Sequence, residues 1–412
     1  MIESLYSIAT KCVQPLAPCL VRLLAPGDPR EREERLGRYG DPGIEDSIWI
    51  HAASAGETEG AEPIVREIGR TVPGRTIVLT SMTAAGKGRA ERIAGVRSHY
   101  APLDIDSAVR SAFRAFRPSA LLLVETEIWP NLIREASRLA VPAAIVNGRI
   151  SAKAFRRMLL VRPLYRAALS RVSLLGVQRE ADRDRFAAFG VPRERIFIHG
   201  NTKIDTESPA PPDLGLRRSD RERWVVFGSV RSAERGAVLR AARAVLEADE
   251  SYRVAVVPRH PARAGDYLGA RGVPLRRWSE AGAGAGRAVL VDTVGDLLSF
   301  YAMGDVAFVG GSLSGHGGHN PIEPARFGVP VLMGPRRENC RDLAVLLEEA
   351  GALEEAADGE ALARKTLALL SDDEERRRRG EAGRAAILAG RGAAARSVRR
   401  LLDAGILKDL QP

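Results

Sequence analysis

The densest group of residues that could bind a ligand lies between Val306 and Pro335. The apolar run 306–309 is typical of a buried strand, and five glycines follow it within nine residues. Asn320 and Pro321 are typical of a helix start, where free N–H groups bind phosphate, and Glu323 can accept bonds from ribose hydroxyls. A nucleotide site is favoured over an ordinary strand–helix connection. Its candidate residues are Gly311, Ser312, Asn320, Pro321, Ile322 and Glu323.

Charged residues also follow apolar runs in the first half of the chain. Glu57 stands at an expected helix start, where a carboxylate can act as a general base on a hydroxyl or favour the helix dipole. Glu125 and Glu127 end a strand of apolar residues, a costly place for carboxylates unless they are used, paired or capping the helix that begins at Pro130. Lys203 offers a compact charge to a carboxylate or phosphate.

The second half repeats this arrangement. Pro258 and Arg259 end one expected strand, and the arginine is suited to a forked contact with phosphate or carboxylate. The turn Val294, Gly295 and Asp296 follows another strand. No HExxH or CxxC spacing is present, and His316 and His319 have no evident third partner, so we expect loop hydrogen bonds from these histidines and no metal.

The elements that must position these residues alternate regularly. Strands are expected at 48–53, 76–81, 98–102, 120–125, 143–147, 174–178, 196–199, 224–229, 253–258, 288–292, 306–309 and 329–333, with helices between them. This pattern predicts an α/β protein with two doubly wound parallel-sheet domains facing each other across a cleft. The boundaries are a helical segment 1–40, a first domain 41–205, a Pro/Ser-rich linker 206–219 and a second domain 220–412 with a helical tail.

Length and charge agree with two domains and an anionic partner. The 412 residues exceed one ordinary core, and the formal net charge is +10. No RNA-binding signature is present, so a membrane surface or phosphorylated substrate is favoured over nucleic acid. Cys12, Cys19 and Cys340 lack a disulfide or zinc pattern and fit a reducing cytosol.

Two segments have the composition of membrane-contacting surfaces. Residues 1–24 are apolar but are interrupted by Pro15 and Pro18, which argues against a simple transmembrane span and leaves an interfacial helix or a packed helix. Residues 149–179 contain eight basic residues and no Asp or Glu, interleaved with leucines. They form either a surface for acidic lipid head groups or a solvated helix face.

Seven segments, in this order, closely resemble the bacterial 3-deoxy-D-manno-octulosonic acid (Kdo) transferases of lipopolysaccharide synthesis. They are HAASAGE, TSMTAAGKGR, VETEIWPN, VNGRIS, HGNTKID, VPRHP and FVGGSLSGHGGHNPIEP. The resemblance runs from Met1 to about residue 340. It implies a GT-B glycosyltransferase, with two Rossmann-like domains, that transfers Kdo from CMP-Kdo to a lipid A precursor (lipid IVA) and releases CMP. Inversion at the anomeric carbon, no required metal and a place on the cytoplasmic side of the inner membrane are also implied.

The resemblance assigns roles to individual residues. Glu57 matches the catalytic base, and Glu125 and Lys203 match positions that stabilise the transition state. The CMP-binding segments are matched by Pro258 and Arg259, by Val294–Asp296 and by Asn320–Glu323.

The chain departs from the family where Arg231 replaces a histidine and Ala233 a glycine; Arg231 is a candidate ligand of the donor's phosphate or carboxylate. Two other functions stay open: another GT-B enzyme that uses a UDP-sugar, either a glycosyltransferase or an epimerase, and a non-catalytic lipid-binding protein.

Overall fold

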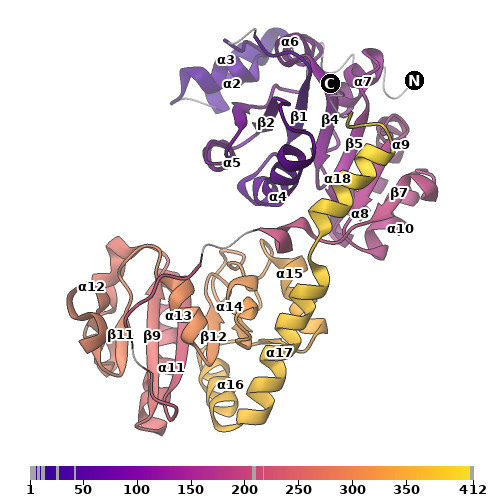
Figure 1. The fold of residues 1–412 in the computed structure, drawn as a ribbon. Helices are drawn as coiled ribbons and strands as arrows, with labels where there is room; N and C mark the ends of the chain where they lie inside the picture. The colour runs from indigo at the N-terminus through magenta and orange to yellow at the C-terminus, as the bar shows by residue number, and fades with distance from the viewer. Residues whose placement is uncertain are drawn as a thin grey trace. The chain divides into compact units, whose positions relative to one another are not determined.

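The computed structural model describes residues 6, 10, 14–24, 27–40, 43–206, 210–216 and 218–408. Contacts divide the chain into two compact units (Figure 1), one of Met1–Glu207 with Gly390–Pro412 and the other of Ser208–Ala389. The expected linker 206–219 spans the boundary, but its residues 207–209 and 217 lie outside the described part, as does most of the expected N-terminal segment before residue 14.

The described residues of the first unit form a seven-stranded, all-parallel sheet in the order β3-β2-β1-β4-β5-β6-β7. The strands are β1 (Ser47–His51), β2 (Ile77–Ser81), β3 (Val96–Tyr100), β4 (Pro118–Val124), β5 (Ala143–Gly148), β6 (Leu174–Val177) and β7 (Ile196–Ile198). The helices are α2 (Ala17–Leu24), α3 (Pro29–Arg35), α4 (Ala55–Thr71), α5 (Ala84–Ala90), α6 (Asp106–Phe116), α7 (Pro130–Arg138), α8 (Ala152–Leu159), α9 (Arg162–Leu169), α10 (Glu180–Ala187) and α18 (Ala393–Asp403).

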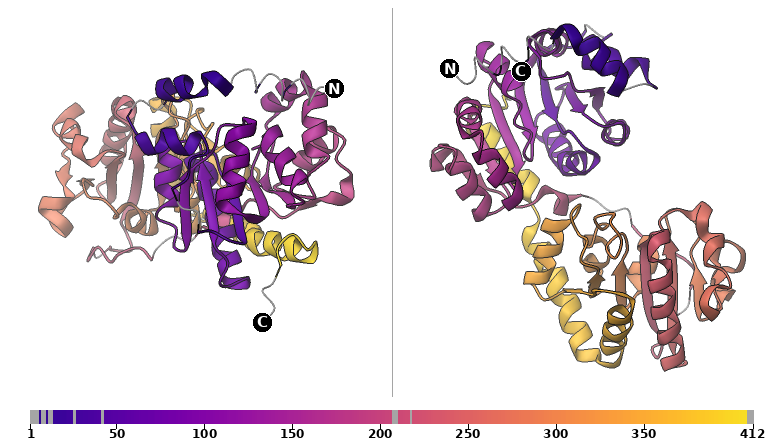
Figure 2. Two further views of the ribbon diagram at one scale, coloured as in Figure 1. Left: turned by 90° about the horizontal axis from the view of Figure 1, so that it is seen from above. Right: turned by 180° about the vertical axis from the view of Figure 1, so that it is seen from behind.

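Both faces of this sheet are covered, as Figure 2 shows. Strand side chains alternate between the faces, so Ile48 and Ile50 pack with α4 and α18, whereas Trp49 packs with α6 and α7. A layer of apolar side chains therefore packs against each face of the parallel sheet. The carboxyl ends of its strands share one edge, which is where such sheets bind ligands.

The second unit repeats the architecture. Its described residues form a seven-stranded parallel sheet in the order β10-β11-β9-β8-β12-β13-β14. The strands are β8 (Arg223–Val230), β9 (Tyr252–Pro258), β10 (Arg276–Arg277), β11 (Ala288–Leu290), β12 (Val306–Val309), β13 (Val331–Met333) and β14 (Leu353–Glu355). The helices are α11 (Arg235–Ala248), α12 (Trp278–Ala281), α13 (Leu297–Met303), α14 (Ile322–Arg326), α15 (Arg341–Glu349), α16 (Gly359–Ser371) and α17 (Asp373–Gly390).

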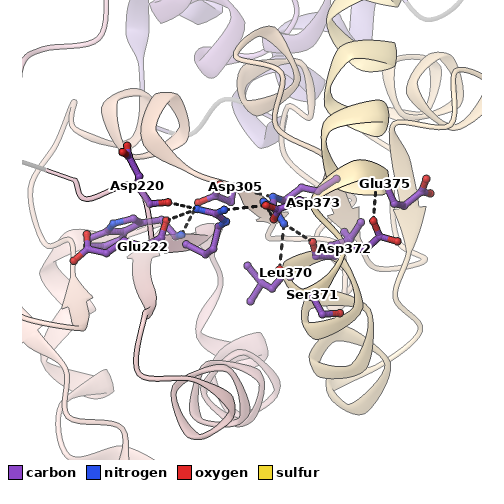
Figure 3. A network of polar contacts seen from close by, with 12 residues as sticks. Asp220, Glu222, Asp305, Leu370, Ser371, Asp372, Asp373 and Glu375 are labelled. Atoms are coloured by element: carbon purple, nitrogen blue, oxygen red, sulfur yellow. Dashed lines mark hydrogen bonds and ion pairs between the residues drawn. The ribbon is translucent and has the colours of Figure 1, made fainter.

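A polar network stabilises the second sheet at the edge where its strands begin (Figure 3). Asp305, just before β12, accepts bonds from the Trp224 amide at 2.7 Å and from Arg218 at 2.8 Å. Asp373 at the start of α17 pairs with Arg223 at 3.0 Å. Arg223 is the first residue of β8, so this ion pair lies at the edge opposite the carboxyl ends of the strands. The network therefore stabilises the unit without contacting the edge where ligands are expected.

The C-terminal tail differs from the expected boundary. The segment Gly390–Pro412 belongs to the first unit, not to a second domain of 220–412. Asp205 caps α18, because its carboxylate accepts the Gly392 and Ala394 amides, each at 2.7 Å, and Arg396 donates to the His199 carbonyl at 2.7 Å. The sequence shows an amphipathic helix here but not which sheet receives its apolar face.

Helix α2, within the expected N-terminal segment, has eight residues. None of the helices in the described part of the chain combines the length and the hydropathy that crossing a bilayer requires.

Candidate active site

The carboxyl edge of the first sheet brings Glu125 and Lys203 together. Glu125 directly follows β4 and is 4% exposed. Its carboxylate accepts a bond from Lys203 Nζ at 2.8 Å and another from Arg149 Nε at 2.7 Å. Two cations therefore compensate one buried carboxylate, which would otherwise be costly to keep ionised.

Glu125 is held in an unusual backbone conformation. Its φ is +60°, a left-handed value that costs a non-glycine residue energy and is concentrated at functional sites. The alternative that Glu125 and Glu127 cap the helix at Pro130 is wrong, because Asp104 caps α7 through the Asn131 amide at 3.1 Å and the Leu132 amide at 2.8 Å.

Lys203 reaches Glu125 because two neighbours leave it room and fix its backbone. A Cβ at Gly60 would lie 2.8 Å from Asn147 Nδ2 and at an ordinary contact distance of 3.5 Å from Lys203 Cε, so the glycine leaves room for the Asn147 side chain beside the lysine. Asn147, fully buried with φ +53°, accepts the Thr202 amide at 3.1 Å. Thr202 in turn donates its hydroxyl to the Gly60 carbonyl at 2.7 Å. The lysine is thus positioned from both α4 and β5.

His199 completes this support as a neutral side chain. Burial lowers its pKa to about 4, and its Nε2 accepts the Asn147 amide at 3.1 Å. A protonated ring could not accept that bond, so the support depends on the neutral form.

Glu57 lies in the first turn of α4 and forms a capping box with Ser54. The Ser54 amide donates to the Glu57 carboxylate at 3.0 Å, and the Glu57 amide donates to the Ser54 hydroxyl at 3.3 Å. Burial and the neighbouring carboxylates of Glu127 and Glu125 raise the pKa of Glu57 to about 7. The capping and general-base interpretations are therefore compatible, because a carboxylate with this pKa can take a proton near neutral pH.

Two further observations locate Glu57 relative to the buried pair. A Cβ at the preceding residue, Gly56, would lie 4.0 Å from Lys203 Nζ. Glu127 accepts a bond from Trp129 at 2.7 Å, and His51 Nε2 lies 3.5 Å from the same carboxylate oxygen. A proton acceptor, a buried ion pair and a third carboxylate thus share one edge of the first sheet.

The carboxyl edge of the second sheet gathers the predicted nucleotide-binding residues. Arg231 follows β8, Arg259 follows β9, the Val294–Asp296 turn follows β11 and the glycine loop follows β12. These four strands are consecutive neighbours in the sheet, in the order β11-β9-β8-β12. Arg259 is exposed, Val294 is 89% exposed, and Gly295 has a φ of +105°.

The glycine loop is fixed by Glu234, a residue that sequence reasoning did not select as a site residue. Its carboxylate is 1% exposed and accepts four backbone amides. The donors are Gly311 and Leu313, each at 2.7 Å, Arg231 at 3.0 Å and Ser314 at 3.3 Å. Glu234 therefore ties the loop after β12 to the turn after β8.

Arg231, which departs from the family pattern, contacts two histidines. Its Nε donates to His319 Nε2 at 3.3 Å, and its Nη1 lies 3.1 Å from His260 Nε2. Burial, with Arg259 and Arg231 nearby, lowers the pKa of His319 to about 4, so His319 is a neutral acceptor near pH 7. The interpretation of His319 as a loop hydrogen-bonding residue agrees with this contact.

Two details of the predicted nucleotide loop differ from expectation. The Ser312 hydroxyl is fully buried, donates to the Val309 carbonyl at 2.6 Å and accepts the Gly334 amide at 2.8 Å, so it joins β12 to the end of β13. Asn320 does accept the Ile322 amide at 3.0 Å, but α14 has only five residues. A helix this short has little macrodipole, so the loop amides and arginines matter more for an anion than expected.

Of the residues missed from the sequence, only Arg149 has a recognisable signal. Arg149 directly follows β5, as Glu125 follows β4, so the same rule about strand ends would have selected it. Asn147 and Glu234 act through backbone amides of distant segments, which no spacing in the sequence reveals. Among the described residues, no three or more His, Cys, Asp or Glu side chains are grouped so as to hold a metal ion.

Comparison with known proteins identifies both units. Residues 30–206 match the family described as 3-Deoxy-D-manno-octulosonic-acid transferase (kdotransferase), and residues 286–386 match glycosyl transferases group 1. The chain is 34% identical to the 3-deoxy-D-manno-octulosonic acid transferase of Haemophilus influenzae, over 95% of each chain. It is 32% identical to that of Bordetella pertussis, over 87% of this chain and 86% of the relative.

Solved structures show the same fold at low identity. A putative UDP-N-acetylglucosamine 2-epimerase from Listeria monocytogenes matches with a TM-score of 0.58 and 16% identity, over 90% of this chain and all of the other. The spinosyn rhamnosyltransferase SpnG, complexed with thymidine diphosphate, matches with a TM-score of 0.55 and 15% identity, over 87% of this chain and all of the other. The predicted GT-B-type fold, with two Rossmann-like units, is confirmed. The chain belongs to the 3-deoxy-D-manno-octulosonic acid (Kdo) transferase family and is a glycosyltransferase.

Proposed function

We propose that this protein transfers Kdo from CMP-Kdo to a lipid A precursor, lipid IVA, and releases CMP during lipopolysaccharide synthesis. Family membership supports Kdo as the sugar and CMP-Kdo as the donor. The observation that carries the chemistry is Glu57, a carboxylate whose pKa is raised to about 7, on the same sheet edge as the buried Glu125–Lys203 pair.

In the proposed reaction, the acceptor hydroxyl loses its proton to the Glu57 carboxylate. The acceptor oxygen forms a bond to the anomeric carbon of Kdo, and the bond from that carbon to the CMP phosphate oxygen breaks with its electron pair staying on the phosphate. Attack from the face opposite the leaving group inverts the configuration. Lys203 and Arg149, with Glu125, supply fixed charges that need no reorganisation during the reaction.

The second unit would receive the leaving phosphate. Arg231, Arg259 and the amides of the glycine loop are positive or hydrogen-bond-donating groups at one sheet edge, suited to a nucleoside monophosphate. We propose that they neutralise it without a metal ion, so turnover should persist in EDTA.

Arg259→Ala is expected to weaken CMP binding by about 10–100-fold, because a bond to a charged group contributes roughly 1.5–3 kcal/mol. Arg259 is exposed and has no ion-pair partner among the described side chains, so its removal should leave the stability of the unit nearly unchanged. Calorimetric titration with CMP measures the effect. Arg263→Ala, at an exposed pair four residues further on, is the control. An Arg259→Ala protein with wild-type CMP affinity would exclude Arg259 from the donor site.

Glu234→Gln is expected to raise KM for the donor by about tenfold or more, with a smaller effect on kcat. The amide NH2 of glutamine would face backbone N–H groups, so charge-assisted bonds to the loop are lost in a buried place. Glu247→Gln, an exposed change on α11 of the same unit, is the control. A positioning role requires that Glu234→Asp recover part of the affinity; an unchanged KM in Glu234→Gln would rule this role out.

Two other functions make different predictions. The structural neighbours include a putative enzyme of UDP-sugars, so a UDP-sugar is the alternative to CMP-Kdo as the donor. If CMP raises the melting temperature in a thermal-shift assay and UDP at equal concentration does not, the CMP-sugar reaction is favoured. A non-catalytic lipid-binding protein would release no CMP when given CMP-Kdo and a lipid A precursor.

We also propose that the protein works on the cytoplasmic side of the inner membrane. A lipid acceptor requires access to a bilayer, and the net charge of +10 favours an anionic surface. Fractionation of cells that express the full chain tests this, since recovery in the soluble fraction alone would contradict it.

A further inference from the structure

Three consecutive apolar residues are exposed where α8 meets α9. Leu159, Leu160 and Val161 are 39%, 84% and 45% exposed. Leu159 ends α8, and Leu160 and Val161 are the two residues that connect α8 to α9. Scattered single exposed leucines are ordinary on protein surfaces, but a contiguous group is not. We call these three residues the α8–α9 tip.

The α8–α9 tip is held by a well-packed base. Phe155 on α8 and Tyr165 on α9 both contact the Phe189 ring, with centroids 5.6 and 5.9 Å apart. Met158 and Leu169 are buried in the main core of the unit. The helices are therefore anchored on their inner faces, and the exposure of the tip does not reflect a poorly packed segment.

Exposed cations lie on both sides of the tip in the chain. Lys153, Arg156, Arg157 and Arg162 are all exposed, and none has an ion-pair partner within the described part of the chain. No Asp or Glu occurs between residues 149 and 179, whereas exposed arginines elsewhere, such as Arg30, Arg193 and Arg243, have a carboxylate partner. An apolar tip flanked along the chain by uncompensated positive charge is complementary to the apolar–anionic boundary of a phospholipid bilayer.

The tip is also connected to the candidate active site. The helix α8 begins three residues after Arg149, whose guanidinium contacts Glu125 at 2.7 Å, and its N-cap is Ser151. One short stretch of chain thus joins the buried charge network to the exposed surface.

From these observations we infer that the α8–α9 tip inserts into the interface of an anionic membrane, with Arg156, Arg157 and Arg162 on the lipid phosphates. The inference rests on the proposed function, because a lipid acceptor must be taken from a bilayer. It assigns bilayer contact to a folded part of the first unit, separate from the N-terminal segment.

Sedimentation of the full chain with vesicles tests this, using phosphatidylcholine with and without phosphatidylglycerol. Wild type should bind the anionic vesicles more tightly. Arg156→Ala/Arg157→Ala/Arg162→Ala should weaken that binding by up to about 100-fold at low salt and flatten its salt dependence. Leu160→Glu/Val161→Glu should weaken it by about tenfold or more. The control, Arg364→Ala/Arg377→Ala/Arg384→Ala, removes the same charge from exposed sites on the second unit and should have less than about a twofold effect.

Insertion is tested separately from charge attraction. Tryptophan fluorescence of Leu160→Trp should be quenched by brominated lipid in anionic vesicles, whereas Leu388→Trp, at a 52% exposed position of α17, should not be. Far-ultraviolet circular dichroism and CMP-induced thermal shifts confirm that each variant is folded. Equal quenching at the two positions, or wild-type vesicle binding by both tip variants, would overturn the inference. So would concentration-dependent dimerisation that both tip variants abolish without a change in vesicle binding.

The outcomes distinguish this inference from the proposed function. If the tip variants lose vesicle binding but still transfer Kdo to acceptor dispersed in detergent, both proposals stand. If wild type binds vesicles through the tip but transfers no Kdo in either setting, the docking surface stands and the proposed function fails.

Discussion

Glu57→Gln is expected to lower turnover by about 10²–10⁴-fold while leaving CMP affinity unchanged, because the variant loses a general base and nothing in the nucleotide-binding unit. Glutamine keeps an oxygen that can accept the Ser54 amide, so the helix cap survives. Steady-state CMP release gives kcat, and calorimetry gives the CMP affinity. Glu59→Gln, two residues further along α4, is the matched control and should keep wild-type turnover.

The same residue predicts the pH dependence. Wild-type turnover should rise as the pH rises through about 7 and then level off, because burial and the neighbouring carboxylates raise the pKa of Glu57 to about 7 and only the ionised form accepts a proton. The residual turnover of Glu57→Gln should lack this step. Near-wild-type turnover in Glu57→Gln, or the same pH step in both proteins, would remove Glu57 from the mechanism.

Stability should change in the opposite sense to activity. A raised pKa means that the folded protein binds the Glu57 proton more tightly than the unfolded chain, so stability falls as the pH rises from about 4.5 to about 7. Above that window Glu57→Gln should be more stable than wild type by on the order of 3 kcal/mol, and near pH 4 the two should be equal. Denaturant unfolding at the two pH values measures this difference.

Lys203→Met should have the second large effect on turnover, because it leaves Arg149 as the cation that pairs with the buried Glu125 carboxylate. We expect turnover to fall by about 10²–10³-fold, the usual cost of removing one preorganised electrostatic group. Losing one charge-assisted bond to a carboxylate that Arg149 still compensates should also lower the free energy of unfolding by about 1.5–3 kcal/mol. Turnover is measured well below the melting temperature, so that loss of folded protein does not contribute.

Two further variants show whether the lysine acts as more than a structural charge. Lys408→Met removes an exposed lysine of the same unit and should change neither property. Glu125→Gln combined with Lys203→Met should recover part of the stability, since no buried carboxylate remains and the Arg149 side chain, 31% exposed, can be hydrated, but it should not recover turnover. If the double variant recovers both, Lys203 is only a structural partner of Glu125.

Much of the fold follows from the sequence because buried parallel strands are short apolar runs between helices. The expected strand at 306–309 coincides with β12, and that at 143–147 differs from β5 by one residue. Strands β10 and β14 were missed, since Arg276–Arg277 and Leu353–Glu355 are short edge strands with charged residues. The docking of α18 on the first unit depends on long-range packing, which periodicity does not encode.

The candidate site was predicted unevenly for the same reason. Polar residues directly after apolar strands, such as Glu125 and Arg259, were recognised because parallel strands end at a common edge. The contact of Lys203 with Glu125 joins residues 78 positions apart, and the four amides on Glu234 come from two different loops. Such contacts follow from the topology of the folded sheet, and local spacing does not reveal them.

Mass spectrometry of the lipid product tests the central claim most directly. Wild-type protein incubated with CMP-Kdo and lipid IVA should give an acceptor heavier by one or more Kdo units, with release of an equal amount of CMP, and Glu57→Gln should give little product in the same time. An unmodified acceptor with wild-type protein that binds CMP would contradict the proposed reaction.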